Sequence, residues 1–155
     1  MNQALLILAP ALPLLLAPLA MRRRWVLPLA ALPALLLALL APVGSTAALP
    51  WLLLGVHLEL DAVGRLFLLF STLIWLGTAT YVGLGRGTDG ASATFGVFFL
   101  LAMAGNILLI VAADIVTFYV GFALMGLSAY GLVLRRSQLA RRCLLYTSDA
   151  ADDEY

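Results

Sequence analysis

The sequence contains no lysine, a single cysteine and a single histidine, and only 11% of its 155 residues are charged. One cysteine, Cys143, excludes an internal disulfide and any metal or cluster site built from four cysteines. The scarcity of charge excludes a soluble domain, because such a domain needs a polar surface that this composition cannot supply. Hydrophobic residues make up 64% of the chain, and its mean hydropathy is +1.07. The composition therefore predicts an all-α integral membrane protein whose immediate partner is the lipid bilayer, with no nucleic-acid partner.

Five apolar runs predict five membrane-spanning helices. A helix that crosses a hydrocarbon core of about 30 Å needs about 20 residues. The runs cover residues 4–20, 25–43, 62–84, 93–113 and 115–134. Prolines interrupt the first two runs, which predicts kinks in two peripheral helices within residues 1–43. Basic residues follow the first run instead of preceding it, so we expect an uncleaved helix, with a cleaved signal peptide as the alternative.

The connection at residues 44–61 contains the only histidine. Its second half, residues 51–61, alternates apolar with polar residues, which is the period of a strand or short hairpin at the membrane edge. His57 beside Glu59 and Asp61 could be part of a metal site or a proton relay. We favour a solvated interfacial loop, and we predict no metal site.

The nine arginines predict the orientation of the chain. If residues 21–24 lie in the cytoplasm, eight arginines lie on that side and only Arg65 lies on the other. The positive-inside rule then places the N-terminus outside, residues 44–61 and Asp114 at the outer side, and residue 135 onward inside. Arg65 follows Asp61 by four residues, a spacing that allows an ion pair across one helical turn.

The last two predicted helices meet at Asp114, the only acid between residues 90 and 149. In the fourth helix, Asn106 is expected to bond a neighbouring helix. In the fifth helix, four residues fall on one face, where the small ones would allow close approach of another helix. These four residues are Tyr119, Ala123, Gly126 and Tyr130.

The last thirteen residues differ from the rest of the chain. They are acidic and show no helical periodicity, and residues 143–152 resemble the conceptual translation of a transposase-type sequencing adapter. We therefore treat residues 143–155 as a non-native tail and expect the natural reading frame to continue beyond Arg142. A natural acidic tail is the alternative.

Three motifs carry a resemblance to a known family. Residues 58–67 contain leucine, aspartate and then Ala62 at the start of the third helix, Thr80-Tyr81 lies near its end, and residues 106–133 contain an apolar helix, an aspartate turn and an aromatic pair. Their order resembles the proton-pumping membrane subunits of respiratory NADH-quinone oxidoreductase. Multi-subunit sodium/proton antiporters and energy-converting hydrogenases contain similar subunits. The resemblance covers residues 49–142.

The resemblance implies that residues 62–142 begin an antiporter-like core in a bacterial-type inner membrane, packed against other membrane subunits. No flavin, haem or cluster motif is present, so we predict no cofactor here and expect the redox chemistry in partner subunits. The family's fifth helix usually carries a glutamate where this chain has Ala123, and its lysines have no counterpart because lysine is absent. The remaining ion-path candidates are Asn106, Asp114, Tyr119, Ser128 and Tyr130, each of which could instead serve packing or a helix boundary.

Three functions stay open at this point. The first is a fragment of a proton- or sodium-translocating subunit, which alone should be inert for transport. The second is a divergent scaffold subunit that has lost the glutamate, and the third is an unrelated five-helix membrane protein such as half of a transporter. Sequence beyond Arg142 would separate them, because broken helices with buried lysines are expected only for the first.

Overall fold

A computed structural model describes residues 2–23, 25–50, 55–84 and 93–152, with the side chains of the last helix described up to Val133. The sequence predicts a polar, glycine-rich turn at residues 85–92, which lie outside these described residues. The described chain forms helices and one small sheet. The elements are α1 (Asn2–Ala20), α2 (Val26–Leu40), β1 (Ser45–Leu49), β2 (Val56–Leu60), α3 (Ala62–Gly83), α4 (Ala93–Val111) and α5 (Ile115–Asp152).

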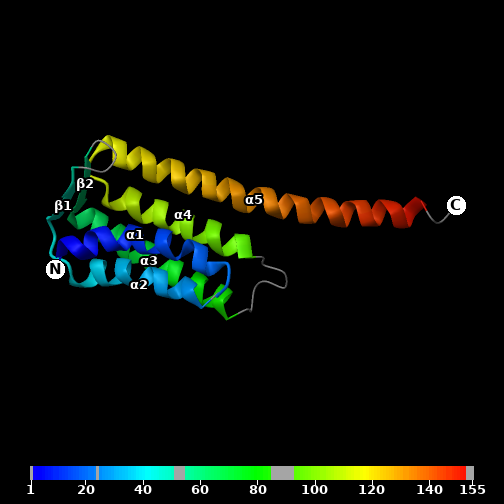
Figure 1. Ribbon diagram of the computed structural model, residues 1–155, viewed down its shortest axis with the longest axis horizontal. Helices are drawn as coiled ribbons and strands as arrows, with labels where there is room; N and C mark the ends of the chain where they lie inside the picture. Colours follow the sequence, from blue (N-terminus) through cyan, green and yellow to red (C-terminus); the bar gives the residue numbers. More distant parts are fainter. Residues whose placement is uncertain (1, 24, 51–54, 85–92, 153–155) are drawn as a thin grey trace.

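The helices run up and down beside one another, with the hairpin and the N-terminus at one end (Figure 1). Helix α1 packs between α2 and α4, α2 also packs on α3, and α5 packs on α4. Within the described residues α1 thus has helices on two sides, and the peripheral position of the helices within residues 1–43 stays a prediction. The helix nearest the edge is α5, whose C-terminal part extends beyond the other end of the bundle.

Four of the helices are long and apolar enough to cross a membrane. They contain the segments Gln3–Ala20, Ala62–Gly83, Thr94–Val111 and Ile115–Val133. Helix α2 has 15 residues, which gives a length of about 23 Å, shorter than a full span. The all-α membrane fold class is thus confirmed, and the described residues contain four candidate spans of full length and the shorter α2 where five spans were predicted.

Small residues let α2 pack tightly into the bundle. Ala30, Ala31, Ala34 and Ala38 are buried, and Leu37 lies among them. Alanine at these positions keeps neighbouring backbones close, which favours dispersion contacts between helices in a medium where the hydrophobic effect does not hold them together. The short helix is therefore held by its fit to α1 and α3.

The hairpin caps one end of the bundle. Strands β1 and β2 pair antiparallel, with Ser45 opposite Leu60 and Leu49 opposite Val56. In β2, Val56, Leu58 and Leu60 face the helices and are buried, while the residues between them are exposed. The alternation in the sequence predicted β2 correctly, although residues 51–54 of the predicted segment lie outside the described residues.

The predicted end of the last helix is wrong. The sequence predicts an end at residue 134, but α5 continues without a break to Asp152. The arginines at residues 135 and 136 end an apolar run without ending the helix, because arginine has a high helix propensity.

Candidate functional site

The turn between α4 and α5 is bonded to the free edge of the hairpin. Ala112 pairs with Leu58 of β2 in an antiparallel bridge, and the Ala113 N–H donates to the His57 carbonyl at 2.9 Å. This isolated bridge holds the turn against the edge of the sheet, which fixes where α5 begins relative to β2.

The Asp114 side chain links the start of α5 to β2. Its Oδ1 accepts a hydrogen bond from the Thr117 N–H at 2.7 Å, and its Oδ2 accepts one from the His57 N–H at 2.9 Å and one from the Thr117 hydroxyl. The bond to Thr117 is that of a helix N-cap, which satisfies a free amide of the first turn. The bond to His57 ties the same carboxylate to β2.

These donors stabilise the charged carboxylate. The Thr117 hydroxyl contributes most, followed by the backbone amides of Thr117 and His57, and together they lower the pKa of Asp114 to about 2. Asp114 therefore remains ionised at neutral pH. The capping role accounts for an acid at this position, and its role in an ion path stays a prediction. Sequence reasoning missed Thr117, although an aspartate directly before an apolar run is a usual sign of a helix start.

Asp61 and Arg65 have separate structural roles at the same end. Asp61 Oδ1 accepts from the Gly64 N–H at 2.7 Å and so caps α3. Arg65 Nε donates to the Ala38 carbonyl at 2.8 Å and its Nη2 donates to the Leu39 carbonyl at 3.1 Å. The two side chains form no ion pair, so that prediction is wrong. Arg65 instead binds the carbonyl end of α2, where a cation is favoured by the helix dipole.

Asn106 connects three helices. Its Oδ1 accepts a hydrogen bond from Trp75 Nε1 of α3 at 3.1 Å, and its Nδ2 lies 3.8 Å from Met125 Sδ of α5. This confirms the prediction that Asn106 bonds a neighbouring helix. Trp75 and Met125 carry no sequence signal that would have identified them as its partners.

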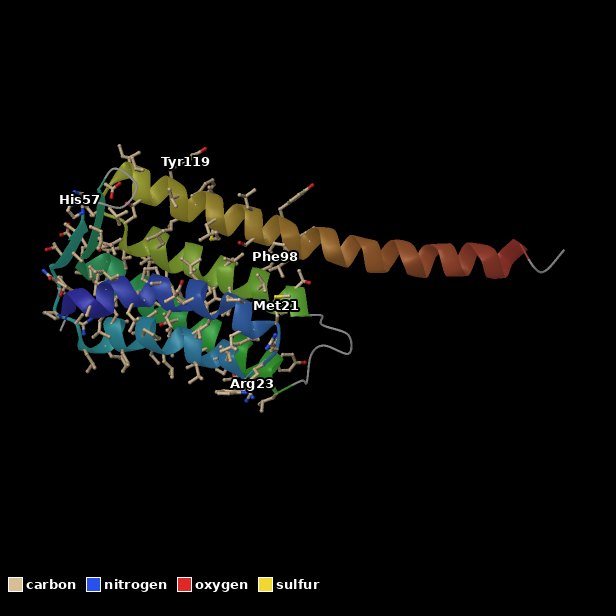
Figure 2. All side chains as sticks on the ribbon, viewed as in Figure 1. Met21, Arg23, His57, Phe98 and Tyr119 are labelled. Atoms are coloured by element: carbon tan, nitrogen blue, oxygen red, sulfur yellow. The ribbon has the colours of Figure 1, made fainter. Side chains whose placement is uncertain are left out.

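The face of α5 predicted to allow close helix approach is not the one that meets α4, and its contact with another helix stays a prediction. Tyr119 and Tyr130 are 69% and 63% exposed, and Figure 2 shows Tyr119 pointing away from the bundle. Gly126 has no neighbouring atom within 4 Å of where a Cβ would be. Ala123, at the position of the family's glutamate, is half-buried.

The face that does contact α4 carries Gly121, Ser128 and Gly131. A Cβ on Gly121 would lie 2.9 Å from Leu109 N, and one on Gly105 would lie 2.6 Å from Met125 N, so the two backbones cross in direct contact. Gly131 packs against the ring of Phe98 on α4 (Figure 2). Ser128 is buried, and its hydroxyl donates to the Leu124 carbonyl at 2.6 Å. That bond satisfies the hydroxyl within its own helix, and its ion-path role stays a prediction.

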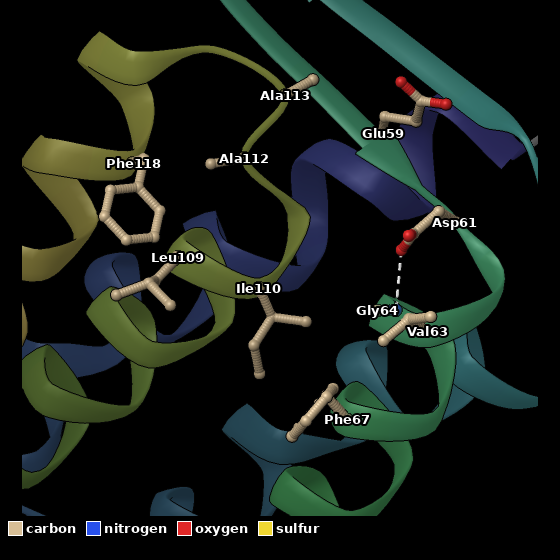
Figure 3. Close-up of a pocket in the computed structure, with 10 residues that line it drawn as sticks. All are labelled: Glu59, Asp61, Val63, Gly64, Phe67, Leu109, Ile110, Ala112, Ala113 and Phe118. Atoms are coloured by element: carbon tan, nitrogen blue, oxygen red, sulfur yellow. Dashed lines mark hydrogen bonds between the residues drawn. The ribbon is translucent and has the colours of Figure 1, made fainter.

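A cleft of about 610 Å³ opens beside this junction, between the start of α3, the end of α4 and the start of α5 (Figure 3). Two carboxylates, of Glu59 and Asp61, lie on its hairpin side. The remaining lining is apolar and includes Val63, Phe67, Leu109, Ile110 and Phe118. Within the described parts of the chain, no three histidine, cysteine or acidic side chains come together as a metal site would require.

Comparison with protein-family models, with curated proteins and with solved structures finds no match to this chain.

Proposed function

We propose that the chain is a membrane subunit of a complex that translocates protons or sodium ions, driven by redox chemistry in partner subunits of the NADH-quinone oxidoreductase, antiporter or hydrogenase type. The observation that supports this proposal is the polar side chain of Asn106 on a face of α4 that leads to the acidic cleft. Leu109 and Ile110 share that face and line the cleft.

The geometry of this face suits a cation at the hairpin end of the bundle. Glu59 and Asp61 place negative charge at the opening, and carbonyls at the C-terminal end of α4 add the negative end of the helix dipole. Asn106 lies four residues, or about 6 Å along the axis, before Ile110. A polar amide at that depth is costly in lipid unless it is bonded or lines a polar path.

The exposure of α5 supports a role within a larger assembly. Its described part packs on α4 along one flank, while Tyr119, Gly126 and Tyr130 lie on surfaces that no described helix covers. Helices of other membrane subunits would cover this surface and supply the ionisable groups that a conducting path needs, because the described spans contain no acid between their ends.

One observation favours the second candidate, a scaffold subunit that does not conduct. Ala123 cannot carry charge, and Asp114, the acid that caps α5, has its pKa lowered to about 2 by its bonds to Thr117 and His57. A group with that pKa does not exchange its proton readily near neutral pH.

Purification of the tagged chain from membranes of its source cells tests the proposal. We expect a multi-subunit complex that contains redox subunits and that drives cation uptake when reconstituted and supplied with an electron donor. The chain reconstituted alone should give no uptake. Recovery of the chain without redox partners would contradict the proposal.

Variants on the exposed tyrosines separate conduction from scaffolding. Tyr119→Phe and Tyr130→Phe remove one hydroxyl each from exposed positions and leave the packing on α4 intact. Slower uptake by an assembled complex would support a conducting role for these residues. Unchanged uptake in both variants, with uptake lost only when the complex fails to assemble, would support the scaffold.

A further inference from the structure

The cleft beside β2 combines an apolar floor with an acidic rim. Val63 and Phe67 of α3 and Phe118 of α5 form its sides, and each is between 48% and 63% exposed. In Figure 3 the Phe67 and Phe118 rings lie on opposite sides of Leu109 and Ile110, while Glu59 lies along the hairpin above them. Large aromatic side chains with this exposure are stable in contact with lipid chains and costly in water.

The position of the cleft along the helices puts it at the membrane surface. Helix α3 begins at Ala62, α4 ends at Val111 and α5 begins at Ile115, and all three residues lie at the hairpin end. The spans therefore enter the hydrocarbon at this level, with the apolar lining below and the two carboxylates at the depth of lipid headgroups. We expect a lipid to reach the cleft from its apolar side, because the exposed Val63, Phe67 and Phe118 side chains line it there.

The charges select the kind of headgroup. Asp61 uses Oδ1 to cap α3, which leaves Oδ2 without a partner among the described residues, and Glu59 forms no hydrogen bond within them. Arg65, which follows Asp61 by four residues, is directed to the carbonyl end of α2. The rim is therefore negative and accepts hydrogen bonds, because Glu59 and Asp61 carry the only polar side chains among the described residues that line this cleft.

We propose that this cleft binds a phospholipid with a primary ammonium headgroup, of which phosphatidylethanolamine is the simplest. The ammonium group has three N–H donors that match the free carboxylate oxygens of Glu59 and Asp61, whereas a choline group has none. The acyl chain lies against Phe67, Ile110 and Phe118. An anionic headgroup such as phosphatidylglycerol is repelled by the two carboxylates. This binding does not depend on ion translocation.

Native mass spectrometry of the full chain in detergent tests the proposal, with phosphatidylethanolamine, phosphatidylcholine and phosphatidylglycerol added in equal amounts. We expect the ethanolamine lipid to be retained over the choline lipid by on the order of fivefold, the ratio that one exposed charge-assisted pair provides. The Glu59→Gln, Asp61→Asn double variant should reduce this ratio to about one, while asparagine at residue 61 preserves the cap of α3.

A control matched in charge is the Asp149→Asn, Asp152→Asn double variant at the far end of α5. Residue 149 lies 31 residues after Phe118 in the same helix, which is about 46 Å away. This variant should keep the wild-type preference. Equal retention of all three lipids by the wild type, or equal loss of preference in both double variants, would overturn the proposal. A dimer or another bound protein that excludes lipid would also overturn it.

Discussion

Replacement of Gly105 by alanine should separate α4 from α5. The added Cβ would lie 2.6 Å from Met125 N, 2.8 Å from the Gly121 carbonyl oxygen and 3.1 Å from Met125 Cα. All three atoms belong to the backbone of α5, so no side-chain rotation relieves the clash. Ordinary contact begins at 3.4 Å, so the helices must move apart by about 0.8 Å. We expect a loss of about 1–3 kcal/mol of unfolding free energy, the usual range for overpacking.

The matched control for this substitution is Gly126→Ala, on the same helix pair but with nothing within 4 Å of its Cβ. It should be neutral or stabilise the protein by up to about 1 kcal/mol, because alanine favours a helix over glycine. Unfolding in mixed detergent micelles, followed by circular dichroism, measures both. If Gly105→Ala is no less stable than Gly126→Ala, the close crossing of α4 and α5 is refuted.

Three further predictions concern the polar groups. The pKa of Asp114 is about 2 in the folded chain and 3.8 as its ordinary value, so its contribution to stability should be complete above about pH 4 and lost as pH falls toward 2. Asp114→Ala should remove this acid-dependent step from the unfolding profile, and a wild-type profile in the variant would contradict the capping role. Arg65→Gln should lower the unfolding free energy by about 1 kcal/mol, because the α2 carbonyls lose their hydrogen-bond donor. Arg23→Gln, at an exposed turn, should change the unfolding free energy little. Equal effects of the two variants on unfolding in detergent would argue against the contact between Arg65 and α2. Asn106→Leu should lower the unfolding free energy by about 0.6 kcal/mol and alter the fluorescence of Trp75. An unchanged fluorescence spectrum would contradict the hydrogen bond between Trp75 and Asn106.

The sequence predicted the helices and β2 because both depend on local pattern. Long apolar runs correspond to α1, α3, α4 and the described span of α5, and the alternation at residues 56–60 corresponds to β2. Strand β1 has no such signal, because Ser45–Leu49 is held by its pairing with β2 and not by its own composition.

The contact face of α5 could not be chosen from its sequence. Two faces of this helix carry small residues, one with Ala123 and Gly126 and the other with Gly121 and Ser128. Only the face with Gly121 and Ser128 meets a glycine on α4. This contact between Gly121 and Gly105 depends on how the two helices are placed relative to each other. The partner of Arg65 was missed for the same reason, since the α2 carbonyls lie 26 and 27 residues away in sequence.

The proposed role in ion translocation is tested most directly by redox-driven cation uptake into inverted membrane vesicles from source cells with and without this gene. Uptake should be lost without the gene and restored when the gene is returned. Glu59→Gln should slow uptake in the restored strain, because it removes negative charge from the opening of the cleft. Full uptake in vesicles that lack the gene would contradict the proposal.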